Sequence, residues 1–464
     1  MKILSRHFSS LVSPVPLLIL LLLASACNKD EAKTEKEKEK ITIADADRIP
    51  LITINTNGTK IPDEPKIDAQ VTVLEKGEET FTGLIGVEIR GSSSQMFPKK
   101  SYGFETRDAN NEDIDVPFLG FPEEEDWILY APYSDKSLVR NKLIFDLARD
   151  LGGYASRTEF VELNINDAYL GVYVVMEKIK RDDFRVNINK LKIDENTGED
   201  LTGGYILKID KTTGISGGAL NELNSFTSPY PPSNATMNQT IAFQYEEPKP
   251  EDITAEQRTY ISEYVTQFEN ALASDDFMDP EVGYNAFIDV DSFIDFFLLN
   301  ELSNNVDGYR LSTFLYKDKN EKLNMGPIWD FNLAFGNADY CGGGDYDVWA
   351  YRFNQRCSED YWQVPFWWDR FLEDPSFVAK VKTRWSALRA GVFAEGAILA
   401  KVDGYITTLD KAGALDTNFE TWDVLGIYIW PNNYIGESHA DEMDYLKSWI
   451  GNRLDWLDQA IGDL

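Results

Sequence analysis

Two aspartates, Asp307 and Asp330, flank a stretch of the chain that predicts a β-hairpin. Residues 311–316 are rich in aromatic and β-branched side chains, the polar residues 317–320 predict a tight turn, and residues 322–328 predict the return strand. Because paired strands lie roughly 5 Å apart, both aspartates should come close together at the open end of the hairpin. Any fold of this chain must therefore accommodate an acidic site at the open end of this hairpin.

The chemistry open to such a pair follows from its oxygen atoms. Mg²⁺ prefers oxygen ligands and is usually held by one or two carboxylates together with phosphate oxygens. A second carboxylate nearby can accept the proton of an attacking hydroxyl group. A structural interpretation also exists, in which Asp307 is a turn residue before Gly308 and Asp330 caps a strand end. Spacing alone leaves both interpretations open.

The N-terminal segment predicts export, because its composition is that of a targeting signal. The basic residues Lys2 and Arg6 precede an unbroken apolar run at 17–23, which is too short to span a bilayer. Residues 1–26 therefore predict a signal peptide whose end resembles a bacterial lipobox, with Cys27 as the lipidated first residue of the mature chain. An ordinary cleaved signal followed by an incidental cysteine is the alternative.

The polar segment that follows predicts a location at the cell surface. Residues 28–31 resemble the surface-export signal of Bacteroidota-type lipoproteins, in which lysine and acidic residues follow the cysteine. Residues 27–42 are nearly all polar, with repeated Lys-Glu, and predict a solvated charged tether. We expect a protein anchored by lipid in the outer membrane or at the cell surface.

The charge of the chain excludes several classes of partner. The 464 residues include 45 Lys and Arg against 78 Asp and Glu, which gives a formal net charge of −33. Such a surface repels nucleic acid and anionic membranes, so we expect no nucleic-acid partner. Nucleotide phosphates would need a local basic pocket or a metal ion. Acidity that only keeps an exported protein soluble is the simpler explanation.

Histidine and cysteine usage narrows the chemistry further. The two histidines are His7, in the predicted signal peptide, and His439, near the C-terminus. Their scarcity argues against a Ser-His-Asp triad, a histidine-rich zinc site or a histidine general base. Catalysis must then come from carboxylates, lysines and a hard metal ion. Cys341 and Cys357 predict a disulfide in an oxidising compartment, and two free or buried thiols are the alternative.

Secondary-structure signals divide the chain into two regions. Residues 43–250 are rich in predicted strands and residues 251–464 are rich in predicted helices, which predicts an α+β protein with two lobes and a cleft between them. Residues 211–249 are rich in Gly, Ser, Asn and Pro and predict a long excursion. The expected strands lie at 51–54, 69–73, 84–90, 101–105, 160–165, 171–177 and 204–210, and the expected helices lie at 137–151, 254–272, 290–302, 375–392, 397–412 and 441–460.

A loop of small residues between two predicted strands is a candidate phosphate site. Such a loop leaves backbone N–H groups and hydroxyls free to hold phosphate oxygens, and nearby cations can neutralise them. A plain turn is the alternative. The residues concerned are Arg90, Ser92, Ser93, Ser94, Lys99 and Lys100.

Three other features have two interpretations each. The strand that ends in Met176 and Glu177 is compatible with the wall of an adenine pocket and with a plain core strand. Arg140, on the predicted helix 137–151, either faces the cleft or, as is more usual for such charges, faces solvent. A sugar-stacking face and ordinary core packing both account for the aromatic group Trp349, Trp362, Trp367 and Trp368.

Taken together, several segments resemble the spore-coat-protein-H (CotH) kinase family. The resemblance covers about residues 80–340 and implies a two-lobed, atypical protein-kinase-like fold. It also implies transfer of phosphate from ATP, with Mg²⁺ or Mn²⁺, to Ser or Thr of exported or surface proteins. The segments that carry the resemblance are 90–94, 97–102, 138–143, 171–178, 305–309 and 326–331.

The resemblance implies roles for individual residues. Asp307 matches the catalytic aspartate of the family, and Asp330 matches its metal-binding aspartate. Lys100, in preference to Lys99, would contact nucleotide phosphates. The remaining matches are Met176 and Glu177, in a segment similar to a kinase hinge, and Arg140, at a recurrent basic position with no assigned role.

Two candidate metal ligands depart from the pattern of many relatives. Asn332 stands where those relatives have an aspartate, and Ser312 stands where some of them have an asparagine. Both are weaker ligands for a hard cation, so the departures put a second metal ion in doubt. Two rival functions follow: an adenylyl transferase on the same fold, and a non-catalytic surface lipoprotein that binds glycan or protein.

Overall fold

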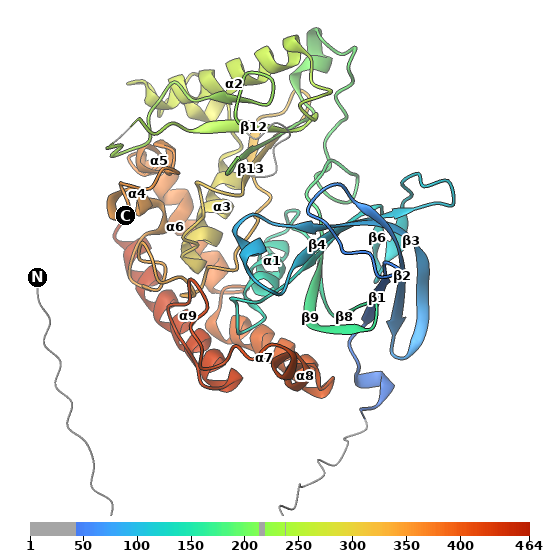
Figure 1. Ribbon diagram of the computed structural model, residues 1–464. Helices are drawn as coiled ribbons and strands as arrows, with labels where there is room; N and C mark the ends of the chain where they lie inside the picture. The colour runs from blue at the N-terminus through green and yellow to red at the C-terminus, as the bar shows by residue number, and fades with distance from the viewer. Residues whose placement is uncertain (1–42, 213–218, 237) are drawn as a thin grey trace, which may run out of the picture. The chain divides into compact units, whose positions relative to one another are not determined.

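Seven strands of the N-terminal region close into a barrel (Figure 1). In order around the barrel they are β1 (Leu51–Asn55), β2 (Ile67–Glu75), β3 (Glu78–Arg90), β4 (Ser101–Arg107), β7 (Asp126–Tyr130), β9 (Ala168–Glu177) and β8 (Thr158–Ile165). Every second side chain is buried along much of β1 and β2, as the period of a strand requires when one face is covered. The interior is filled by large apolar side chains, among them Phe104 and Trp127. A small hairpin, β5 (Val116–Phe118) and β6 (Phe121–Glu124), lies between β4 and β7 in the sequence.

The computed structural model describes residues 43–212, 219–236 and 238–464. The predicted signal peptide, Cys27 and the charged tether lie outside these residues. Among the helices of the described part, none is long and apolar enough to cross a membrane.

A second sheet combines strands from both predicted regions. Its order is β11 (Ser225–Thr227), β12 (Ala242–Glu247), β10 (Tyr205–Ile209), β13 (Thr313–Lys317) and β14 (Leu323–Met325). The antiparallel pair β13 and β14 is the hairpin predicted between Asp307 and Asp330. Because β10 pairs with β13, the sheet crosses the predicted boundary at residue 250. The strands β11 and β12 lie in the segment 211–249, for which the sequence predicted only a long excursion.

The C-terminal region is helical, as predicted, and the chain is an α+β protein. Its second helix, α3, is apolar on most sides and is almost wholly buried, because other helices and the strand β14 pack against it. A capping box formed by Thr254 and Gln257 begins α2, as the sequence predicted. The helices are α1 (Arg140–Asp150), α2 (Ala255–Ala273), α3 (Val290–Ser303), α4 (Phe353–Arg356), α5 (Trp367–Phe371), α6 (Pro375–Arg389), α7 (Glu395–Lys411), α8 (Ala414–Thr421) and α9 (His439–Gly462).

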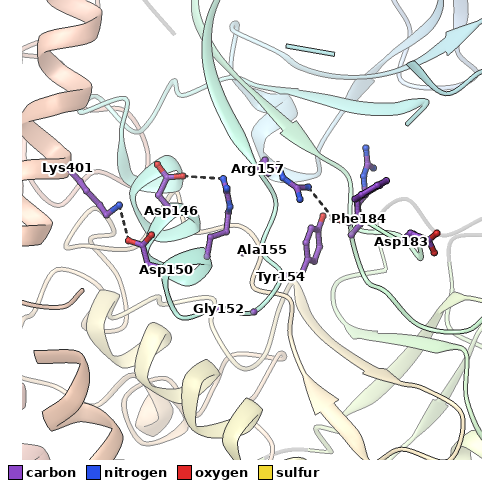
Figure 2. Close-up of a pocket in the computed structure, with 12 residues that line it drawn as sticks. Asp146, Asp150, Gly152, Tyr154, Ala155, Arg157, Asp183, Phe184 and Lys401 are labelled. Atoms are coloured by element: carbon purple, nitrogen blue, oxygen red, sulfur yellow. Dashed lines mark hydrogen bonds and ion pairs between the residues drawn. The ribbon is translucent and has the colours of Figure 1, made fainter. Parts of the chain in front are cut away.

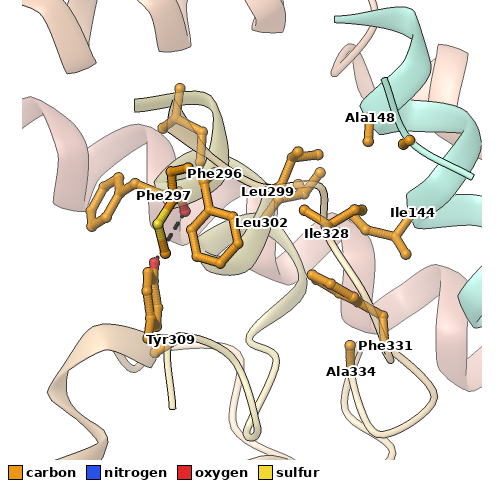
Figure 3. Packing of buried hydrophobic residues seen from close by; sticks show 14 of the residues in the cluster. Ile144, Ala148, Phe296, Phe297, Leu299, Leu302, Tyr309, Ile328, Phe331 and Ala334 are labelled. Carbon is orange, nitrogen blue, oxygen red and sulfur yellow. Dashed lines mark hydrogen bonds between the residues drawn. The ribbon is translucent and has the colours of Figure 1, made fainter. Parts of the chain in front are cut away.

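The main core joins α1 to the helical region. Figure 3 shows Ile144 of α1, Phe296 and Leu299 of α3, and Ile328 and Phe331 of the chain after β14 within one cluster. The segment that contains Asp330 is therefore held between α1 and α3. The tryptophans Trp367 and Trp368 are buried in the same core, so they take no part in a sugar-stacking face.

A buried ion pair connects α3 to α9. The Glu301 carboxylate accepts hydrogen bonds from the Tyr309 hydroxyl at 2.9 Å and from the Ala350 and Tyr351 backbone N–H groups at 2.8 and 2.9 Å. Arg453 donates to its Oε2 at 3.3 Å and to its backbone carbonyl at 2.7 Å. Both side chains are fully buried, so each charge relies on the other for compensation.

Replacing one member of this pair should destabilise the protein strongly. Arg453→Met leaves the Glu301 carboxylate buried without its cation, and we expect a loss of about 3–5 kcal/mol in the free energy of unfolding. Chemical denaturation followed by circular dichroism measures it. The matched control is Arg48→Met, since Arg48 pairs with Asp45 in solvent, and it should cost less than about 1 kcal/mol. Equal losses in the two variants would contradict this account.

Candidate active site

Asp307 lies in the loop between α3 and β13, and two donors fix its carboxylate. The helix α3 ends at Ser303, and the residue that caps it, Asn304, adopts a left-handed conformation with φ 42°. Asp307 Oδ1 accepts a hydrogen bond from the Arg310 guanidinium at 2.7 Å and from the Tyr340 hydroxyl at 3.2 Å. Its side chain is 15% exposed. Both donors use Oδ1, so Oδ2 is the oxygen that these contacts leave available.

Asp330 lies at the other end of the hairpin, five residues beyond β14. Its φ of +61° is unusual for a residue other than glycine, and its neighbours fix this conformation. The next N–H group, that of Phe331, donates to Asn141 Oδ1 of α1 at 2.8 Å. The Asn305 amide contacts the Asp330 carbonyl oxygen at 3.5 Å. Helix α1 and the Asp307 loop therefore both hold the segment that carries Asp330.

The surroundings raise the pKa of the Asp330 carboxyl to about 7. Desolvation by the surrounding protein is the largest cause, and the Asp307 and Asp210 carboxylates follow. The solvent-accessible surface area of Asp330 nevertheless makes it an exposed residue. Solvent thus reaches a carboxylate that many protein atoms surround. The influence of Asp307 on this pKa places the two aspartates within electrostatic range of each other, as the hairpin predicted.

A third carboxylate, Asp210, was not predicted for this site. It follows β10, and the pairing of β10 with β13 brings it beside the hairpin. The backbone N–H groups of Lys211 and Ser312 donate to its carboxylate, while burial raises its pKa. The sequence placed Asp210 at the end of a strand, but it gave no signal for the partner of that strand.

Two cations act on the same carboxylates. The guanidinium of Arg90, which ends β3, lies 5.8 Å from the centre of the Trp329 ring. Lys211 Nζ donates to Ser93 Oγ at 3.4 Å. Both charges oppose the rise in the pKa of Asp330, so both lie near it. Arg90 was a predicted phosphate-binding residue, whereas Lys211 was missed because it belongs to the Gly- and Ser-rich excursion.

The predicted lysines of the phosphate loop point elsewhere. Lys99 is buried, and its Nζ donates to the Val172 carbonyl at 2.7 Å and to Asn418 Oδ1 at 2.9 Å. Lys100 Nζ donates to the Gln95 and Phe97 carbonyls within its own loop. In this conformation both ammonium groups are occupied by protein oxygens, and phosphate contact would require those bonds to break.

The three predicted serines of the phosphate loop, Ser92, Ser93 and Ser94, follow the turn at Gly91. Ser92 and Ser93 are exposed, and Ser94 is half-buried. Gly91 has φ +113°, and a Cβ atom there would lie 2.1 Å from Ser94 Oγ, so this turn requires glycine. Ser93 is linked to the candidate site through Lys211.

Arg140 is not on a solvent face, contrary to the default expectation. It is fully buried and donates to Asp135 Oδ1 at 2.7 Å and to the Phe335 carbonyl at 3.5 Å. Its charge is therefore compensated inside the protein, and it supports the chain that follows Asp330.

Met176 and Glu177 belong to a plain core strand, which was one of the two interpretations of this segment. The backbone of β9 pairs with β7 on one side and β8 on the other, so it offers no free edge to a base. The Met176 side chain is in the main core, and Glu177 accepts a hydrogen bond from the Arg157 guanidinium at 2.6 Å.

The remaining predicted residues lie close to the aspartates in the chain. Ser312 has φ 47° and donates its backbone N–H to Asp210. The Asn332 carbonyl accepts a hydrogen bond from the Asn337 amide at 2.8 Å. The predicted disulfide between Cys341 and Cys357 is present.

The donor set around Asp330 fits a hard divalent cation. Carboxylate oxygens are the ligands that Mg²⁺ and Mn²⁺ prefer. Asp307 and Asp210 raise the pKa of Asp330 by repulsion, and a cation would remove that repulsion. A tighter acidic group of the described residues, Asp115, Glu124 and Glu125, already contains the Lys180 ammonium, at 2.5 Å from Glu124 and 2.6 Å from Glu125.

Comparison with known proteins supports the resemblance seen in the sequence. The model of the family described as CotH kinase protein matches residues 87–457, which include Arg90, both aspartates, the helices α1 to α8 and most of α9. The inner spore coat protein H of Bacillus subtilis (strain 168) is 34% identical over 95 residues. That alignment covers 20% of this chain and 24% of the relative, so the chain spans about a quarter of the curated relative that it matches. Because the family match extends over most of the sequence, the chain belongs to the CotH kinase protein family.

Proposed function

We propose that this protein transfers a phosphoryl group from ATP to a Ser or Thr hydroxyl of an exported or surface protein. One observation carries the proposal: the Asp307 carboxylate is oriented by Arg310 and Tyr340 and lies within electrostatic range of Asp330. Kinases require this combination of an oriented proton acceptor and a metal-binding carboxylate. Membership of the CotH kinase family supports the same reaction.

Asp307 is the group that accepts the proton. Its Oδ1 is engaged by Arg310 and Tyr340, so Oδ2 receives the proton from the acceptor hydroxyl. The acceptor oxygen forms a bond to the γ-phosphorus as the bond from that phosphorus to the bridging oxygen breaks, and ADP leaves. The positive charge of Arg310 beside Asp307 keeps the carboxylate in place during the transfer.

Asp330 would hold the metal ion, with Asp210 as a further carboxylate beside it. When bound, Mg²⁺ or Mn²⁺ neutralises phosphate charge in the transition state. Arg90 and Lys211 are the protein cations near these carboxylates, and they would orient the phosphates together with Ser93. Asn141 keeps the Asp330 segment in place through the Phe331 N–H group. We assign no role in binding to Lys99, Met176 or Glu177.

The protein would act outside the cell, anchored by lipid at Cys27. The lipobox-like signal and the charged tether motivate this location. Globomycin, which blocks lipoprotein signal processing, should retain the unprocessed chain in producing cells if Cys27 is lipidated, and unchanged processing would refute the anchor.

The two aspartates should separate binding from transfer. Asp307→Asn should retain ATP binding in the presence of Mg²⁺, because the metal-binding carboxylate is intact, but lower the transfer rate by about 10²–10⁴-fold. Asp330→Ala should abolish ATP binding. Calorimetry measures binding, and label from the γ-position of ATP measures transfer to protein.

The same labelling decides between the rival functions. Transfer of label from the α-position of ATP, and not from the γ-position, would show that the protein transfers an adenylyl group instead of a phosphoryl group. Binding of a glycan or protein that persists in the double variant Asp307→Ala and Asp330→Ala, without any nucleotide binding, would establish a non-catalytic protein.

The proposal also predicts how the stability of the metal-free protein depends on pH. Asp330 has a folded-state pKa of about 7, above the 3.8 of an ordinary aspartate, so the folded state binds more protons than the unfolded state between these values. Stability should therefore decrease as the pH rises from about 4 through 7 and then level off. Asp330→Asn removes this titration, so its melting temperature relative to wild type should increase over the same window.

Mg²⁺ provides the control for the pH experiment. Above pH 7, a concentration of ten times the dissociation constant should stabilise the wild type by about 1.4 kcal/mol, because the ion binds only the folded state. Asp330→Asn should show no such gain. A gain of the same size in both proteins would place the metal elsewhere.

Substitutions can show which of the lysines contributes to ATP binding. Lys211→Gln removes a charge near Asp330, so ATP affinity in Mg²⁺ should fall about tenfold, equivalent to about 1.4 kcal/mol. Lys190→Gln, at an exposed position, is the matched control and should bind ATP as the wild type does. If Lys100→Gln, and not Lys211→Gln, weakens binding, the phosphate loop rearranges and the earlier prediction for Lys100 stands.

A further inference from the structure

A cavity of about 540 Å³ lies at the end of α1, but its charges are largely paired within the protein. Figure 2 shows Lys401 with Asp150, at 2.9 Å, and Arg157 pairs with Glu177 at 2.6 Å. The residues that line this cavity include neither catalytic aspartate nor the donors that orient them. A protein that presents a Ser or Thr hydroxyl must instead meet the surface beside Asp307.

The loop 424–437, between α8 and α9, carries a group of exposed apolar side chains. Of the large apolar side chains that are exposed in the described part of the chain, four lie within nine positions of this loop. Exposed apolar side chains that gather in one place are typical of surfaces that bind other proteins. We call these four residues, Ile427, Tyr428, Trp430 and Ile435, the 427–435 patch.

Trp430 connects the patch to the proton acceptor. Its ring lies parallel to the ring of Tyr340, with 6.3 Å between ring centres and 2° between ring planes. The Tyr340 hydroxyl donates to Asp307 Oδ1 at 3.2 Å. Trp430 is nevertheless 42% exposed, so part of its indole is accessible to a partner. The patch is therefore one side chain away from the carboxylate that receives the proton.

The backbone of the loop is fixed to the chain that follows Asp330. The Asp339 N–H group donates to the Pro431 carbonyl, and the Asn433 N–H group donates to the Asn337 carbonyl, each at 2.9 Å. A partner would thus meet a surface whose backbone is already ordered, which lowers the entropic cost of binding.

The second donor to the proton acceptor, Arg310, also lies beside an exposed aromatic residue. Its guanidinium donates to the Trp362 carbonyl at 3.2 Å, and Tyr361, the preceding residue, is 55% exposed. The rings of Tyr361 and Trp362 meet edge to face, with 4.9 Å between their centres. Each of the two groups that orient the proton acceptor therefore adjoins an exposed aromatic side chain.

The charges around the patch disfavour an acidic partner. Residues 412–446 contain seven Asp or Glu and no Lys or Arg, so a carboxylate on the partner would be repelled. The carboxylate beside the patch, that of Asp339, already accepts the Tyr428 hydroxyl at 2.7 Å. The patch itself consists of two isoleucines and two aromatic residues, so burial of apolar surface is the main contribution that it can make to binding.

We propose that the 427–435 patch is the docking surface for the acceptor protein, and that it selects an extended segment with an apolar side chain near the Ser or Thr. Trp430 determines this specificity, because it belongs to the patch and packs on Tyr340. This inference rests on the proposed phosphoryl transfer, in which Asp307 accepts the proton of the acceptor hydroxyl.

Short peptides test the docking surface with the full chain. They have a central serine in a glycine background and differ only in the residues that flank it, which are phenylalanine, lysine or glutamate. A fluorescent group on each peptide reports its dissociation constant without nucleotide, and label from the γ-position of ATP reports kcat and KM. We expect the phenylalanine peptide to bind about tenfold more tightly than the lysine peptide, and the glutamate peptide to bind most weakly. Equal binding of the three, or tighter binding of the lysine or glutamate peptide, would overturn the apolar specificity.

Substitution of Trp430 tests the residue itself. Trp430→Ala should weaken binding of the phenylalanine peptide about tenfold and raise its KM, whereas Trp430→Phe should retain most of the binding. ATP affinity in Mg²⁺ should stay the same in both variants. The matched control is Phe184→Ala, which removes an exposed aromatic side chain outside the patch and should bind the peptide as the wild type does. Unchanged peptide binding in Trp430→Ala would overturn the docking surface.

The two measurements separate this inference from the proposed function. Peptide binding that depends on Trp430, without transfer of label, would support the docking surface and contradict phosphoryl transfer. Transfer of label to the phenylalanine peptide with the same KM in the wild type and in Trp430→Ala would do the reverse. A phenylalanine peptide that neither binds nor accepts label would overturn the docking surface.

Discussion

The candidate active site depends on one buried carboxylate, that of Glu301. An ionised group without water is costly, so it must collect donors, and Glu301 takes them from three segments of the chain, at Tyr309, at Ala350 and Tyr351, and at Arg453. Tyr309 is one of these donors, and it lies two residues after Asp307. The loop that carries Asp307 is thereby fixed to α3 and α9 at a point away from solvent. Arg310 and Tyr340 then only have to orient the carboxylate of Asp307 itself.

The Asp330 segment is fixed in a different way, by the helix α1. Asn141 holds the backbone beside Asp330, while Arg140 reaches the Phe335 carbonyl and is neutralised by Asp135. The side chains of Ile144 and Phe331 complete this contact in the core (Figure 3). Asp307 and Asp330 are therefore held in place by different parts of the structure. Movement of α1 relative to α3 would change the distance between the two aspartates.

The predictable parts of this structure are those whose causes are local. The hairpin β13–β14 was predictable because strand residues and a polar turn are contiguous, and this hairpin was the basis for predicting Asp307 and Asp330 at one site. The capping box before α2 and the apolar helix α3 are local for the same reason. The α+β class follows from the sum of such segments.

The contributions of Asp210 and Lys211 could not be predicted, because they depend on a partner more than a hundred residues away. Only the pairing of β10 with β13 brings Asp210 to the hairpin. For Lys99 the error was the reverse, because the sequence predicted a phosphate contact for a residue that lies away from the site. Its ammonium is instead buried against Asn418 of α8, a contact that no local pattern encodes.

The disulfide between Cys341 and Cys357 acts on the residues that orient Asp307. Tyr340 precedes one cysteine, and Asp360, which lies 3.4 Å from the Arg310 guanidinium, donates its N–H group to the Cys357 carbonyl. The cross-link thus joins the two flanks of the Asp307–Arg310 pair. A chain whose thiols are still reduced would lack this cross-link, and its Asp307 carboxylate would be held less firmly. If Asp307 has the role proposed for it, formation of this disulfide would be a condition for full activity, so the timing of oxidative folding would set when the site becomes active.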